Sequence, residues 1–182
     1  MTRIIAGDAG GQRLEVPAHG TRPTSDRVRE AIFSRLEHVD AISRARVLDL
    51  YAGSGALGLE ALSRGSESVV FVEANRAAAE VIRRNVARLG YGSRARVVHT
   101  SVASFLAGTA GEPFHTVLAD PPYDLDEAPA VLTALEPWLG PESVVLWEQS
   151  GRARPPAWPD GFVDLGARRY GETTVHLAEV PG

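Results

Sequence analysis

The chain has 182 residues, the length of one globular domain with at most a small extension. Its apolar content of 44% and charged content of 23% exclude a wholly disordered chain, and the absence of cysteine excludes disulfide frameworks, cysteine zinc sites and cysteine nucleophiles. The sequence contains neither an apolar run of membrane-spanning length nor a signal-peptide core, so we expect a cytoplasmic protein.

The formal net charge of −4 conceals an uneven distribution of charge along the chain. All 19 basic residues are arginines. Residues 1–96 contain 15 arginines and 11 acidic residues, whereas residues 97–182 contain 4 arginines and 12 acidic residues. A basic N-terminal half favours an anionic polymer as a partner.

The first part of the chain predicts a β-hairpin and a linker, followed by a helix. Short strands are expected at Arg3–Ala6 and Gln12–Val16, and Thr24 or Ser25 can cap a helix with apolar residues at helical spacing. We therefore divide the chain into residues 1–24, a hairpin and linker, and residues 25–182, the main domain.

Strands and helices alternate in the main domain from Arg46 onward. Helices are expected at Ala56–Arg64, Asn75–Leu89, Val102–Ala107 and Asp126–Leu139. Strands are expected at Arg46–Tyr51, Ser68–Glu73, Arg96–Thr100, Thr116–Asp120 and Ser143–Glu148, with a closing antiparallel hairpin of Phe162–Arg169 and Thr173–Glu179. This order predicts an α/β fold, a doubly wound, Rossmann-like, seven-stranded and mostly parallel sheet, with ligands at the carboxyl ends of its strands.

A glycine-rich loop follows the first strand of this sheet. Gly53, Gly55 and Gly58 satisfy the pattern G-x-G-x-x-G between a strand and a helix, and Glu73 ends the next strand, where it could hold ribose hydroxyls. Taken alone, this pattern is typical of dinucleotide binding, and an NAD-dependent oxidoreductase is therefore one hypothesis.

Asp49 favours a different cofactor. It lies near the carboxyl end of the first strand, where a carboxylate would repel a pyrophosphate but attract an ammonium and a sulfonium group. S-adenosylmethionine carries both positive groups and a ribose diol. The expected cofactor-binding residues are Asp49, Tyr51, Gly53, Ser54, Gly55, Glu73, Ala74, Ser101 and Val102.

The tetrapeptide Asp120-Pro121-Pro122-Tyr123 follows the fourth strand and is the candidate catalytic element. Two adjacent prolines remove two N–H donors, so the loop presents hydrogen-bond acceptors. Acceptors in fixed positions suit an exocyclic amino group, because they hold its hydrogens and direct its lone pair at the methyl carbon. Tyr123 would stack on an extruded base.

Together these elements resemble the bacterial 16S rRNA guanine-N2 methyltransferases of the RsmD type, which are class I enzymes. The resemblance runs from residue 3 to residue 123, and Tyr51 stands where that family is expected to have phenylalanine. The matching stretches include Arg3-Ile4-Ile5-Ala6-Gly7, Thr21-Arg22-Pro23-Thr24, Asp26–Phe33, Asp49–Gly65 and the Asp120 tetrapeptide. The resemblance implies transfer of a methyl group from S-adenosylmethionine to guanine N2 in 16S rRNA, within a small-subunit ribosomal particle, by a monomer.

For an RNA enzyme, arginines of the N-terminal region are the candidate phosphate contacts, and the hairpin would be a recognition arm. These residues are Arg3, Arg13, Arg22, Arg27 and Arg29. The five histidines lack metal-ligand spacing, so no metal site is expected. Amino-group methylation of DNA or of a protein glutamine, and RNA binding without catalysis, are further alternatives.

Overall fold

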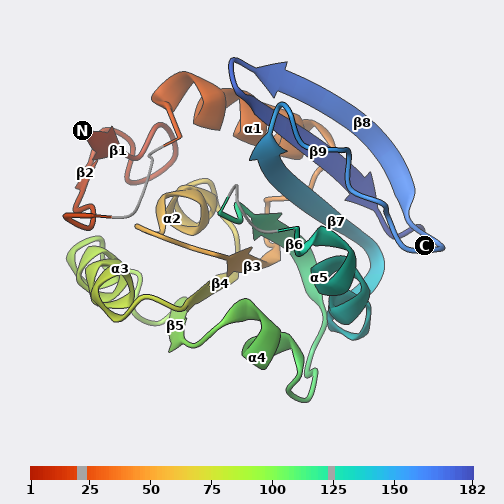
Figure 1. The fold of residues 1–182 in the computed structure, drawn as a ribbon. Coiled ribbons are helices and arrows are strands. Elements are labelled where there is room, and N and C mark those ends of the chain that lie inside the picture. The colour runs from red at the N-terminus through yellow and green to blue at the C-terminus, as the bar shows by residue number, and fades with distance from the viewer. Residues whose placement is uncertain (20–23, 123–125) are drawn as a thin grey trace.

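The computed structural model describes residues 1–19, 24–122 and 126–182, which form a seven-stranded sheet covered by helices and a two-stranded sheet at the N-terminus (Figure 1). The strands are β1 (Thr2–Arg3), β2 (Arg13–Leu14), β3 (Arg46–Leu50), β4 (Ser68–Glu73), β5 (Ala95–His99), β6 (Phe114–Ala119), β7 (Leu139–Ser150), β8 (Val163–Tyr170) and β9 (Thr173–Glu179). The helices are α1 (Asp26–His38), α2 (Ala56–Ser63), α3 (Arg76–Arg88), α4 (Val102–Leu106), α5 (Ala128–Leu135) and the 3-10 helix η1 (Glu136–Trp138).

The large sheet has the strand order β5-β4-β3-β6-β7-β9-β8. Its first five strands are parallel, and β9 pairs antiparallel with both β7 and β8. The chain leaves β3 in one direction, toward β4 and β5, and returns to the other side of β3 with β6. Ligands bind at such a reversal in doubly wound sheets, so the topology places a site at the carboxyl ends of β3 and β6.

Helices cover both faces of the sheet, as the sequence predicts (Figure 1). Apolar residues of α1, α2 and α3 pack in one cluster with Val47 and Leu118, and those of α4 and α5 pack in a second cluster with Leu48 and Val117. Neighbouring residues of one strand therefore belong to opposite cores, which explains why the parallel strands lack alternation of apolar and polar residues.

The helix starts confirm the capping residues read from the sequence. The Ser25 side chain accepts a hydrogen bond from the Val28 backbone N–H, and the Asn75 side chain accepts one from the Ala78 N–H. These side chains satisfy donors that have no partner within the first turn of a helix. The last helix is shorter than predicted, because Pro137 lacks an N–H group and a 3-10 turn replaces the final α-helical turn.

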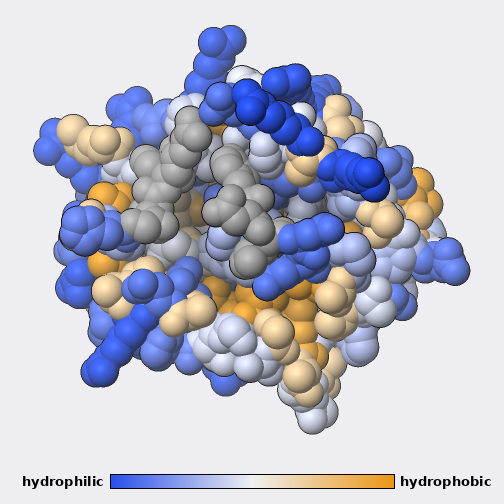
Figure 2. Space-filling view, viewed as in Figure 1, coloured by the Kyte–Doolittle hydropathy of each residue, from blue (hydrophilic) through white to orange (hydrophobic). Residues whose placement is uncertain are grey.

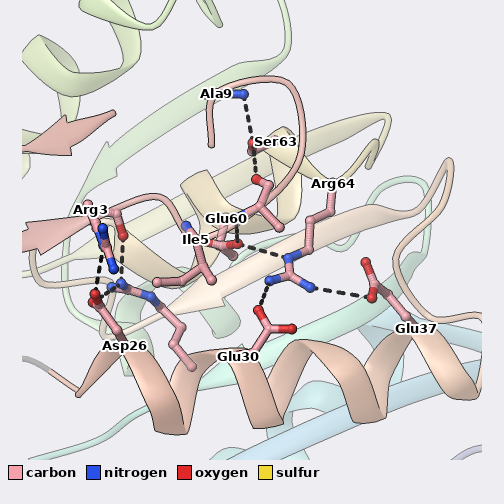
Figure 3. Close-up of polar contacts among 11 residues, drawn as sticks. Arg3, Ile5, Ala9, Asp26, Glu30, Glu37, Glu60, Ser63 and Arg64 are labelled. Atoms are coloured by element: carbon pink, nitrogen blue, oxygen red, sulfur yellow. Dashed lines mark hydrogen bonds and ion pairs between the residues drawn. The ribbon is translucent and has the colours of Figure 1, made fainter. Parts of the chain in front are cut away.

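The N-terminal segment forms the expected hairpin, with shorter strands, but it packs into the core of the main domain. The side chains of Ile4 and Leu14 are buried in the same cluster as α1 and α2. The buried Glu60 carboxylate on α2 accepts the backbone N–H groups of Ile5 at 2.8 Å and Ala6 at 3.0 Å. Figure 3 shows these contacts beside the ion pairs of Arg64.

Two further contacts fix this segment. Ser63 accepts the backbone N–H of Ala9, and the buried side chain of Asn85 on α3 exchanges two hydrogen bonds with the backbone of Glu15 (Figure 3 shows the Ser63 contact). The sequence predicts that this hairpin is a recognition arm, but in the structure it is packed against the main domain and does not form a separate arm. Although the segment has few apolar side chains, Ile4 and Leu14 complete the core, and its backbone satisfies buried polar groups of α2 and α3.

Arg29 is buried, although the sequence predicts that it contacts RNA phosphates. Its side chain is only 1% exposed. It donates hydrogen bonds to the Arg3 carbonyl oxygen and to the Asp26 carboxylate, and burial lowers its pKa. Arg29 thus joins α1 to the N-terminal segment and cannot lie along an RNA backbone.

Candidate active site

A cavity of about 790 Å³ lies where the topology predicts a site, at the carboxyl ends of β3, β4, β6 and β7. Figure 2 shows this side of the molecule, with apolar surface (orange) in a hollow near its centre. The cavity wall contains most residues that the sequence predicted for the cofactor and the reaction: Asp49, Tyr51, Gly53, Ser54, Glu73, Ala74, Ser101, Val102, Asp120, Pro121 and Pro122. Tyr123 and Arg22 lie outside the described residues.

The glycine-rich loop makes a tight turn between β3 and α2. Tyr51, Gly53 and Gly55 all have positive φ angles, of 57°, 58° and 79°, which explains the two glycines. Gly55 is the residue before α2 and does not itself line the cavity. A Cβ atom on Gly58 would lie 2.3 Å from the Phe71 ring, so this glycine allows α2 to pack closely on the sheet.

Asp49 is buried beneath this loop. Its carboxylate accepts the Gly58 backbone N–H at 2.9 Å, and burial raises its pKa to about 8. Asp49 therefore borders the cavity as predicted, but its carboxylate is hydrogen-bonded to the backbone of Gly58, near the start of α2. Its contribution to a bound ammonium group stays a prediction.

Glu73 binds the loop from the end of β4. One of its carboxylate oxygens accepts the Gly53 N–H at 2.7 Å, and the other accepts the Asn75 N–H at 2.7 Å. The Glu73 carboxylate therefore fixes the glycine loop relative to the start of α3, and its predicted contact with ribose hydroxyls would be additional.

Tyr51 contacts a residue that the sequence did not suggest. Its hydroxyl donates a hydrogen bond of 2.7 Å to Glu127 near the start of α5, and burial together with this bond raises the pKa of Tyr51. Ser101 caps α4 by accepting the Ser104 N–H. Because the wall here offers hydroxyl and backbone groups, adenine recognition would depend on those groups.

Two carboxyl groups lie at the ends of neighbouring strands, and only one of them was predicted. Asp120 follows β6, and Glu148 lies near the end of β7 with 2% of its surface exposed. Burial raises the pKa of Asp120, and burial together with the nearby Asp120 charge raises the pKa of Glu148. A carboxyl group ending the apolar run Ser143–Glu148 was the signal that could have identified Glu148, since Asp120 follows its strand in the same way.

The raised pKa values of Asp49, Asp120 and Glu148 predict how stability depends on pH. Each group holds its proton in the folded state at a pH where the unfolded chain, with ordinary carboxyl pKa values of about 4, has lost it. Stability should therefore be highest at mildly acidic pH and fall as the pH rises through about 8. Thermal unfolding of the ligand-free protein at a series of pH values measures this, and Glu148→Gln should give a shallower decline. A melting temperature that rises steadily over this range would contradict the prediction.

The predicted RNA-contacting arginines are divided between surface and core. Arg3, Arg13 and Arg27 are exposed, and Arg3 forms an ion pair with Asp26 at 2.9 Å. Among the described residues, no cluster of acidic residues and histidines suits a metal ion. In the same residues, no helix is long and apolar enough to cross a membrane.

Comparison with known proteins identifies several methyltransferases that are similar to this chain. Ribosomal RNA small subunit methyltransferase D of Escherichia coli K12 is 43% identical over 149 residues, covering 80% of this chain and 73% of the relative. The Haemophilus influenzae protein of that name is 34% identical over 180 residues, which cover 96% of this chain and 92% of the relative. A tRNA1(Val) (adenine(37)-N6)-methyltransferase of Bacteroides fragilis is 32% identical over 84 residues, 46% of this chain.

Solved structures of similar proteins have the same fold as this chain. The solved structure of the Escherichia coli protein yhhF superimposes with a TM-score of 0.89 and 38% identity, covering 98% of this chain and 97% of that one. The family model described as Conserved hypothetical protein 95 matches residues 2–179. Because this match spans almost the whole chain and the curated relatives agree with it, the chain belongs to the RsmD family of methyltransferases.

Proposed function

We propose that this protein transfers a methyl group from S-adenosylmethionine to the exocyclic N2 amino group of a guanine in 16S rRNA. The observation that supports this most strongly is that Asp120, Pro121 and Pro122 share one cavity with the glycine loop and Glu73. The relatives named ribosomal RNA small subunit methyltransferase D support the substrate class. We place the reaction in the cytoplasm, on a small-subunit ribosomal particle, with the protein acting as a monomer.

The cavity suits S-adenosylmethionine better than a dinucleotide. Asp49, Glu73, Asp120 and Glu127 all border it, and carboxyl groups oppose a pyrophosphate but favour a cation that also carries hydroxyl groups. We assign the ribose to Glu73, the amino-acid part to the glycine loop from Gly53, and the adenine to Ser101 and Val102. When bound, S-adenosylmethionine supplies an electrophilic methyl group.

Asp120 and the loop after it would orient the attacking amine. The lone pair of a nucleobase amino group is delocalised into the ring, so the nitrogen is a poor nucleophile. The Asp120 carboxylate and the Pro121 carbonyl can accept its hydrogens, which favours a pyramidal nitrogen and exposes the lone pair. Pro121 and Pro122 cannot donate backbone hydrogen bonds, so they do not compete for these acceptors.

The cofactor assignment predicts a binding defect. Glu73→Ala should weaken binding of S-adenosylmethionine by about 10- to 100-fold, since it removes a charged acceptor and leaves the Gly53 N–H unpaired. Calorimetric titration measures this. Glu67→Ala is the matched control, because Glu67 is exposed just before the other end of β4. An unchanged affinity in Glu73→Ala would contradict the assignment.

The base and the RNA can be tested in one experiment. Small-subunit particles from a strain that lacks this protein would be incubated with the enzyme and labelled S-adenosylmethionine, and the rRNA digested to nucleosides. We expect the label in N2-methylguanosine. The relative named as a tRNA adenine-N6 methyltransferase makes adenine the second candidate, and label in N6-methyladenosine would establish it and exclude guanine.

A further inference from the structure

Glu148 is a buried carboxyl group that the reaction as described above does not use. It lines the cavity, and only 2% of its surface is exposed. One oxygen is 3.4 Å from the Thr24 hydroxyl, a long hydrogen bond, and the other oxygen has no hydrogen-bond partner among the described residues. An acceptor buried in this way costs free energy unless a ligand in the cavity supplies a donor.

The fold places Glu148 beside Asp120. Strands β6 and β7 are parallel neighbours, and Ala119 and Trp147 are paired in their register. Asp120 directly follows β6, Glu148 is the next residue of β7, and the Asp120 charge contributes to the raised pKa of Glu148. A base held by Asp120 at its amino group would therefore present the adjoining ring atom to Glu148.

An acceptor for an amino group does not by itself distinguish guanine from adenine, because both bases carry one. The atom next to the amino group differs between them. Guanine has a hydrogen on N1, next to the N2 amine, whereas N1 of adenine, next to the N6 amine, is an acceptor. A site that recognises an extruded base through this edge must match the ring atom as well as the amine.

We infer that Glu148 accepts the N1–H of the target guanine while Asp120 accepts a hydrogen of its N2 amine, so that Glu148 is the residue that selects guanine. This inference rests on the proposed function. Hydrogen bonds to the charged form lower the pKa of a carboxyl group, so guanine binding would favour the ionised form of Glu148. At a pH above the pKa of Glu148, where its carboxyl group is ionised, adenine would instead bring its N1 lone pair against the carboxyl oxygens and would be repelled.

The test keeps the N2 amine of the target base and changes N1 from a hydrogen-bond donor to an acceptor. Once the modified nucleotide has been located, small-subunit particles are reconstituted with either guanosine or 2-aminopurine riboside at that position. 2-Aminopurine keeps the N2 amine, but its N1 is an acceptor. At about pH 9, where Glu148 is ionised, we expect wild-type kcat/KM to be about 10- to 100-fold higher for guanine. In Glu148→Gln the ratio should fall by about 10-fold, because the side-chain amide can donate to N1 of 2-aminopurine.

Two controls separate selection from a structural role. Glu142→Gln makes the same chemical change at an exposed position near the other end of β7, and its ratio should equal that of the wild type. Asp120→Asn should slow both substrates alike and leave the ratio unchanged. Glu148→Gln should retain wild-type affinity for S-adenosylmethionine, measured by calorimetry.

The outcomes distinguish this inference from the proposed function. A wild-type ratio near one, an unchanged ratio in Glu148→Gln, or an equal loss of rate on both bases would overturn the inference and leave guanine methylation standing. If nucleoside analysis of wild-type product instead finds N6-methyladenosine, the proposed function and this inference fail together. A ratio that falls in Glu148→Gln alone supports selection by Glu148.

Discussion

Asp120→Ala is expected to reduce methyl transfer to small-subunit particles by at least about 100-fold while changing the affinity for S-adenosylmethionine by no more than a few-fold. The proposed partner of Asp120 is the target amine, so its loss should affect the chemical step more than cofactor binding. Preorganised groups that stabilise a transition state contribute effects of about this size. The initial rate of labelled methyl transfer and calorimetric titration measure the two quantities.

Asp160→Ala provides the control, because Asp160 is exposed in the loop between β7 and β8. It should behave as the wild type in both measurements. A normal rate in Asp120→Ala would show that the acceptor mechanism is wrong. Equal losses of rate and of cofactor affinity would instead show that Asp120 belongs to the cofactor site.

Deletion of residues 1–16 is expected to unfold the protein or to lower its melting temperature severely. The deletion removes Ile4 and Leu14 from the core and leaves the buried Glu60 carboxylate without two of its donors. A hydrogen bond to a charged group contributes about 1.5–3 kcal/mol, so the loss of two of them is a large share of the roughly 5–15 kcal/mol that stabilises a domain. Circular dichroism during heating measures the effect.

A role of the hairpin in RNA binding requires a milder change than truncation. The double substitution Arg3→Ala with Arg13→Ala removes two exposed side chains and leaves the buried backbone contacts of the segment intact. We expect near-normal stability, weaker binding to rRNA and a shallower dependence of that binding on salt, because fewer phosphates are neutralised. RNA affinity equal to that of the wild type at every salt concentration would exclude these two arginines from the interface.

The local sequence contains enough information for most of the fold. Helix starts follow from Ser25 and Asn75, whose side chains satisfy nearby backbone donors, and the buried parallel strands follow from short apolar runs such as Ser68–Glu73. The carboxyl ends of adjacent parallel strands must lie at one edge of a sheet. For that reason the sequence alone predicts that the glycine loop, Glu73 and Asp120 share one site.

Contacts between segments that are distant in the sequence could not be predicted from local patterns. They depend on which segments pack against one another once the sheet has formed. A two-strand hairpin containing Arg3 and Arg13 has the composition of an exposed arm. Only the packed fold shows that its backbone satisfies Glu60, 54 and 55 residues away along the chain. Arg29 has the same ambiguity, since a single arginine is equally compatible with a phosphate contact and with a buried hydrogen-bond network.

Within the site, Glu148 also shows the difference between what the sequence predicts and what only the packed fold determines. The sequence places an acidic residue at the end of an apolar strand, but the number of its hydrogen-bond partners is a property of the assembled cavity. In the part of the chain that the structure describes, one oxygen of Glu148 has only the long contact with Thr24, 124 residues away, and the other oxygen has no donor. The sequence therefore determines which groups line the edge of the sheet, and the tertiary packing determines which of them still have an unused hydrogen-bonding capacity for a substrate.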